Sequence, residues 1–196
     1  MKKLLGFSIF LVFVLIASLT AEAKVTLPAI FSDNMVLQQN TQVNVWGKAA
    51  PGEKVTVKAS WLDKAVTAKA AANGKWTVKL KTPKAITNQS VTVSGENEIT
   101  INNVLIGEVW LCTGQSNMEF PVSRHPDVKW NTGMLNEAEE LKDADYPEIR
   151  LFHVKHQLAH EGELDDCEGE WLVCNPKNLY DFSAVGFVFG RKLYKE

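Results

Sequence analysis

The chain has 196 residues, with 21 lysines and arginines against 23 aspartates and glutamates, which gives a formal net charge of −2 at pH 7. This slightly acidic balance argues against nucleic acid or an anionic membrane surface as the partner, because both attract strongly basic proteins. The length suits one domain or two small ones.

The first 23 residues have the pattern of a secretory signal. Lys2 and Lys3 precede an apolar stretch over residues 4–19, and Ala21-Glu22-Ala23 resembles an A-x-A cleavage site. The apolar stretch is shorter than the roughly 20 residues that span a bilayer. The sequence therefore predicts a signal peptide over 1–23, cleavage near Ala23, a secreted or periplasmic protein and no stable membrane anchor.

Residues 24–104 alternate between apolar and polar side chains, as half-buried strands do. The alternation covers residues 43–46, 54–59, 75–80, 90–93 and 98–101, with turn sequences at 50–53 and 73–74. This spacing predicts a small antiparallel β-sandwich. Trp46 and Trp76 are expected in its core, and the alternative is an exposed tryptophan that stacks on a sugar.

The pattern changes near Val104, where we place a domain boundary between 24–104 and 105–196. Residues 109–112 form a short apolar run, which predicts a buried strand, and Gly114 then allows a sharp turn. Ser116 follows at the expected strand-to-helix turn, where a hydroxyl and backbone N–H groups can serve acyl transfer. No glycine closes a G-x-S-x-G elbow, so spacing alone leaves an ordinary turn serine open.

Beyond Ser116, the sequence predicts an acidic helix near 134–141, a strand over 146–154 and a solvated acidic loop over 161–170. Apolar residues at helical spacing predict a helix over 182–194, with Ser183 as its cap. One apolar face of that helix is expected to be exposed, together with strand edges.

The three cysteines suggest no metal site. Cys112 is expected to be a buried free thiol in the strand before Ser116, whereas Cys167 and Cys174 could form a disulfide if their geometry allowed it. His153, His156 and His160 lack convincing zinc spacing. No metal or cofactor is predicted.

Residues 110–118, WLCTGQSNM, are similar to the nucleophile block of the sialate O-acetylesterase family, in the SGNH-hydrolase superfamily. Residues 27–38, 45–47, 51–55 and 73–76 resemble its N-terminal β-domain, and residues 146–154 and 171–176 resemble later segments. The resemblance implies a mixed fold: an antiparallel β-sandwich followed by the first part of an α/β, three-layer, SGNH-like domain. It also implies an exported carbohydrate esterase that removes O-acetyl groups from sialic acid or related sugars, with Ser116 as nucleophile.

The family's blocks that supply the catalytic histidine, its aspartate and further oxyanion contacts have no counterpart in this sequence. His125, His153, His156 and His160 are poor substitutes. His125 lies in a loop before a proline, with no aspartate at a suggestive spacing, and His153 lies on a predicted strand. The sequence is therefore expected to be the N-terminal portion of a longer esterase that is inactive alone, and a separate polypeptide could complete its site. The alternative is a non-catalytic exported β-sandwich that binds glycan or protein through Trp46, Trp61 or Trp76.

Overall fold

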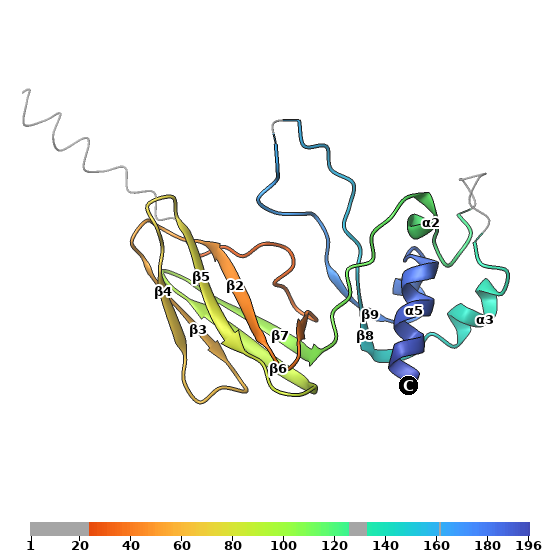
Figure 1. The fold of residues 1–196 in the computed structure, drawn as a ribbon, viewed down its shortest axis with the longest axis horizontal. Helices are drawn as coiled ribbons and strands as arrows, with labels where there is room; N and C mark the ends of the chain where they lie inside the picture. Colours follow the sequence, from red (N-terminus) through yellow and green to blue (C-terminus); the bar gives the residue numbers. More distant parts are fainter. Residues whose placement is uncertain (1–23, 126–132, 161) are drawn as a thin grey trace, which may run out of the picture.

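The computed structural model describes residues 24–125, 133–160 and 162–196 (Figure 1). The predicted signal peptide over 1–23 lies outside the described residues. Over the described residues, the fold is a mostly-sheet mixed α/β structure. No helix among them is long and apolar enough to cross a membrane.

The N-terminal part consists of strands, in two sheets. Five strands hydrogen-bond in the order β1-β7-β6-β3-β4, and β2 pairs with β5 in a separate two-stranded sheet. Each predicted alternating run lies within one of these strands, whereas the short β1 and β4 were not predicted. The strands are β1 (Val36–Gln38), β2 (Gln42–Lys48), β3 (Lys54–Ala59), β4 (Val66–Lys69), β5 (Lys75–Lys81), β6 (Ile86–Ser94) and β7 (Glu98–Gly107).

One strand pair departs from the antiparallel prediction. β1 runs parallel to β7, with Val36 opposite Leu105, while the other pairs in both sheets are antiparallel. Parallel neighbours need a long crossover between them, and the chain from β2 to β6 provides it. The segment before β1 is also hydrogen-bonded to β7, because the Asn34 N–H donates to the Asn102 carbonyl at 3.0 Å.

The two sheets share one hydrophobic core. Val45 of β2, Val57 of β3 and Leu80 of β5 are fully buried in it, and Trp76 is 2% exposed, as predicted. Trp46 is 40% exposed, so its predicted core position is wrong. The period of two explains this, because Val45 faces inward and its neighbour must face outward. The Trp46 ring instead lies edge-on against Phe31, with ring centroids 4.6 Å apart.

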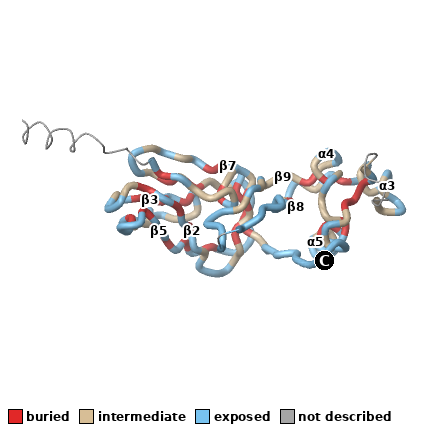
Figure 2. Tube along the Cα trace, turned by 90° about the horizontal axis from the view of Figure 1, so that it is seen from above, coloured by how far each residue is buried: buried red, intermediate tan, exposed pale blue. Residues whose placement is uncertain are grey.

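The C-terminal part places one long helix beside a two-stranded hairpin (Figure 1). Its second core contains Leu151, Leu179 and Phe187, and buried positions form a separate group there (Figure 2). The domain boundary at residue 104 stays a prediction. The elements are α2 (Ser116–Glu119), α3 (Glu137–Lys142), β8 (Tyr146–Phe152), β9 (Trp171–Cys174), α4 (Pro176–Leu179) and α5 (Ala184–Lys195).

The helix predicted over 182–194 is confirmed by α5. Its predicted cap is also confirmed, because the Ser183 hydroxyl accepts a hydrogen bond from the Gly186 N–H at 3.1 Å. A partly buried ion pair between Arg191 of α5 and Glu140 of α3 fixes the two helices. Hydrogen bonding from Arg191 lowers the pKa of Glu140.

The strand predicted over residues 109–112 is wrong. The segment has no strand structure, and Trp110 and Leu111 are 58% and 86% exposed. The Val109 N–H donates to the side chain of Gln38 at 2.9 Å, rather than to a neighbouring backbone. An apolar run forms a buried strand only when other strands flank it, and β8 and β9 pair with each other instead.

Candidate active site

Ser116 is the first residue of α2, after Gln115 at the N-cap position, and it is exposed to solvent. The chain after this short helix is bonded to the start of α5. The Ala184 N–H donates to the Phe120 carbonyl at 2.8 Å, and the Val122 N–H donates to the Phe182 carbonyl at 3.0 Å. These bonds fix where α2, and therefore Ser116, lies on the C-terminal part.

Ser116 lines a cavity of about 1130 Å³ between the exposed segment after β7, the strand β8 and the helix α5. This volume is slightly above the upper end of the usual range of ligand pockets, roughly 300–1,000 Å³. Glu119, His153 and His156 are among the other polar side chains that line the same cavity. The arrangement gives Ser116 access to a ligand of the size of a sugar.

Two histidines of the described chain pair with carboxylates, and one of these pairs lines the cavity. His156 Nε2 lies 3.2 Å from Glu119 Oε1, and the His156 side chain is 84% exposed. His125 Nε2 lies 2.5 Å from Asp181 Oδ1, so the expectation that His125 lacks a carboxylate partner is wrong. The two residues are 56 positions apart, and sequence spacing gives no signal for such a pair.

The histidine pairs do not reach the candidate nucleophile. Within the described ranges, no side chain forms a hydrogen bond with the Ser116 hydroxyl, and neither His125 nor Asp181 lines its cavity. A serine attacks an ester only when a base takes its proton. Ser116 therefore has access to the cavity but lacks a bound base in this arrangement.

The cysteines differ from the prediction at one position. Cys112 is exposed, so the expected buried thiol is wrong, for the same reason that its strand is absent. Cys167 and Cys174 are both free thiols, and the disulfide left open by the sequence is not formed. Burial raises the pKa of the Cys174 thiol to about 11, which keeps it protonated and unreactive at neutral pH.

Apolar side chains of α5 remain uncovered beside the cavity, as the sequence predicted for this helix. Val185, Val188, Phe189 and Leu193 are 40–49% exposed. The exposed Trp110 packs edge-on against Phe189, with ring centroids 5.1 Å apart. A surface of this kind marks an interaction site more often than a free surface.

No group of three or more histidine, cysteine, aspartate or glutamate side chains within residues 24–125, 133–160 and 162–196 could hold a metal ion.

The chain is similar to known acetylesterases over most of its length, although no protein-family profile matches it. It is 31% identical to the sialate O-acetylesterase of Mus musculus, over 85% of this chain and 32% of that protein. It is 29% identical to the sialate O-acetylesterase of Homo sapiens, over 83% of this chain and 33% of that protein. The crystal structure of a carbohydrate acetylesterase from Xanthomonas citri has a TM-score of 0.76 and 31% identity, over 86% of this chain and 37% of that chain.

These matches confirm the predicted resemblance to the sialate O-acetylesterases. The chain spans about a third of the length of the curated relatives it matches. The partial coverage fits the expected match to an N-terminal portion.

Proposed function

We propose that this chain carries the nucleophile of an exported esterase that removes O-acetyl groups from sialic acid or a related sugar. In this proposal, residues 24–104 form a β-sandwich and residues 105–196 the first part of an SGNH-type layered domain. The observation that carries it is the position of Ser116 at the start of α2, on the wall of a sugar-sized cavity. The likeness to sialate O-acetylesterase and to a carbohydrate acetylesterase supports the substrate class.

The proposed reaction has two acyl-transfer steps. Ser116 Oγ attacks the acetyl carbonyl and gives its proton to a base, and the backbone N–H of Ser116 donates to the oxygen that becomes negative. The bond between the acetyl carbonyl carbon and the sugar oxygen breaks, the base returns its proton to that oxygen to form the sugar hydroxyl, and an acetyl-enzyme remains. Water then attacks this ester, releases acetate and regenerates Ser116. The route uses side chains, backbone donors and water.

The base and its orienting carboxylate are proposed to come from a complementing polypeptide. The supporting observation is that no described side chain bonds to the Ser116 hydroxyl, while apolar residues of α5 lie uncovered beside the same cavity. A polypeptide docked on this face could bring a histidine to Ser116 and bury the apolar side chains. On this account, residues 24–196 alone have little esterase activity.

Hydrolysis of 4-nitrophenyl acetate tests both parts of the proposal. We expect background rates from residues 24–196 alone, and a Ser116-dependent rate when the remaining two thirds of a related sialate O-acetylesterase are added as a separate polypeptide. Ser116→Ala removes the nucleophile, and Ser94→Ala is a control on the distant strand β6. Activity that survives Ser116→Ala would refute the nucleophile. Activity of the chain alone that Ser116→Ala abolishes would keep the nucleophile but refute the need for a complementing polypeptide.

A second candidate function is sugar or protein binding by the N-terminal sheets without catalysis. The exposed ring of Trp46, 40% accessible, favours this candidate, because exposed tryptophans offer an apolar face with a polar edge. Trp76 is too buried to take part, and Trp61 is half-buried and donates to the Lys81 carbonyl at 2.9 Å. Two results together would favour this candidate. The chain would bind acetylated glycans in a way that Trp46→Ala abolishes, and it would show no esterase activity even with the complementing polypeptide present.

A further inference from the structure

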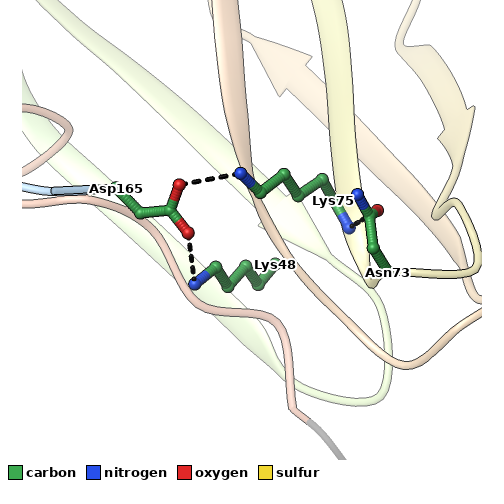
Figure 3. A network of polar contacts seen from close by, with 4 residues as sticks. All are labelled: Lys48, Asn73, Lys75 and Asp165. Atoms are coloured by element: carbon green, nitrogen blue, oxygen red, sulfur yellow. Dashed lines mark hydrogen bonds and ion pairs between the residues drawn. The ribbon is translucent and has the colours of Figure 1, made fainter. Parts of the chain in front are cut away.

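The acidic residues before β9 are exposed, as the sequence predicted for this loop, and two of them also bind the N-terminal part of the molecule. We name residues 162–170 the acidic strap. Asp165 of the strap lies between two lysines, with Oδ2 3.1 Å from Lys48 Nζ and Oδ1 2.7 Å from Lys75 Nζ (Figure 3). These hydrogen bonds and charges lower the pKa of Asp165, so it stays ionised.

The two lysines form a site that favours an anion even before the strap is considered. Lys48 ends β2, Lys75 begins β5, and the two residues are directly opposite each other in the strand register. Like charges at opposed positions destabilise a strand pair. Asp165 contacts both ammonium groups, so it offsets a repulsion that the pairing of β2 with β5 imposes.

Further contacts attach the strap and the residue after it to the same N-terminal part. Both carboxylate oxygens of Asp166 accept from the Ala29 N–H, at 3.1 and 3.2 Å. Trp171, which begins β9, donates from its indole to the Ile30 carbonyl at 2.8 Å. The strap therefore contacts the N-terminal part at two places: Asp165 binds the lysine pair, and Asp166 binds Ala29.

The strap also forms part of the wall of the cavity that Ser116 lines. Cys167 lines that cavity, directly after the two docking aspartates. The Glu168 carbonyl accepts from the Lys155 N–H at 2.9 Å, which ties the strap to the segment that carries His153 and His156. Movement of the strap away from the lysines would therefore alter this wall of the cavity.

We propose that the opposed Lys48–Lys75 pair is the receptor of an electrostatic clamp, in which docking of Asp165 closes the cavity wall at Cys167. The lysine and aspartate side chains of the clamp are 55–57% exposed. Ion pairs of this exposure are screened by salt, so the clamp opens as the ionic strength rises. The clamp proposal does not depend on whether Ser116 is a nucleophile.

Alkylation of the cysteines in the full chain measures the opening directly, because the three thiols differ in accessibility. Cys167 is half-buried and reports the strap, Cys112 is exposed and serves as an internal reference, and Cys174 is buried. Rates of iodoacetamide labelling are followed for each cysteine by peptide mass spectrometry at 20 mM and 1 M NaCl. At low salt, Asp165→Asn is expected to speed Cys167 labelling relative to Cys112 by about threefold, in keeping with an exposed ion-pair network.

The matched control is Glu163→Gln, which removes the same charge from the same strap at a residue without a hydrogen bond or ion pair in the described structure. The wild type at 1 M NaCl should behave as Asp165→Asn does at low salt, and a Lys75→Gln/Asp165→Asn double variant should label no faster than Asp165→Asn. Equal Cys167 rates in Asp165→Asn and Glu163→Gln would refute the clamp. A parallel rise of Cys174 and Cys167 labelling would also refute it, because Cys174 is buried in the C-terminal core and its labelling reports general unfolding.

Discussion

The N-terminal and C-terminal parts of the molecule bury their apolar side chains to very different degrees. Val45, Val57 and Leu80 are inaccessible in the shared core of the two N-terminal sheets. In the C-terminal part, Leu111 is 86% exposed and Phe189 is 41% exposed, close to the candidate nucleophile. One part is therefore closed around its own core, whereas the other leaves apolar side chains uncovered.

Limited proteolysis tests this comparison as a whole. We expect a protease of broad specificity to cut residues 105–196 well before residues 24–104, because regions with few buried contacts open more often. Cleavage sites and rates are read by mass spectrometry over time. Equal resistance of the two ranges would contradict the comparison.

Truncation of one leucine in each part should sharpen the comparison. Leu80→Ala is expected to lower the free energy of unfolding by about 3 kcal/mol, because it leaves a cavity in a closed core. Leu193→Ala, at a side chain 42% exposed on α5, should change it by less than about 0.5 kcal/mol. Urea unfolding followed by circular dichroism gives both values. A similar loss of unfolding free energy in the two variants would contradict the difference between the two parts.

Two glycines of the C-terminal part should respond in opposite directions to alanine. A Cβ at Gly169 would lie 2.7 Å from the Phe152 ring and 2.9 Å from the His153 carbonyl, so Gly169→Ala should cost about 2 kcal/mol. A Cβ at Gly190 of α5 meets nothing within 4 Å, so Gly190→Ala should stabilise the helix by about 0.5–1 kcal/mol. Thermal unfolding of both variants is the measurement, and destabilisation by Gly190→Ala would show that this helix face is already covered.

The ion pair between Glu140 and Arg191 predicts a pH dependence of the C-terminal part. Because the pair lowers the pKa of Glu140, its contribution to stability is complete above the ordinary glutamate value of 4.5 and is lost as pH falls through the lowered pKa. Glu140→Gln should cost about 2 kcal/mol at pH 7 and flatten the acid side of the stability curve.

Glu139→Gln is the matched control for this ion pair, since Glu139 is exposed on the same helix. Urea midpoints between pH 3 and pH 7 provide the comparison. An unchanged pH profile in Glu140→Gln would refute the role of the pair.

The sequence was most informative where one local pattern determines the structure. Alternation located the longer strands, and the helical period with a capping Ser183 located α5, because both depend on neighbours a few residues apart. The prediction for residues 109–112 was wrong because a buried strand depends on flanking strands that a local run does not reveal. Trp46 was misplaced although strict alternation from Val45 already pointed it outward.

Of the candidate site, only the sequence motif around Ser116 could be predicted. The block around Ser116 suggested a nucleophile, but the pairing of His125 with Asp181 and the docking of Asp165 join residues far apart in the chain. Such contacts depend on how the parts pack, and composition and spacing carry no signal for them. The acidic residues of the strap were therefore interpreted as a solvated surface.

Covalent trapping of Ser116 tests the central claim most directly. A fluorophosphonate ester reacts with a serine only when a base activates it. Residues 24–196 are incubated with this reagent, alone and with the complementing part of a related esterase, and the adduct is mapped by peptide mass spectrometry. The account predicts an adduct on Ser116 that forms only in the complemented mixture and is absent from Ser116→Ala. Complemented acetylesterase activity without an adduct on Ser116 would contradict it.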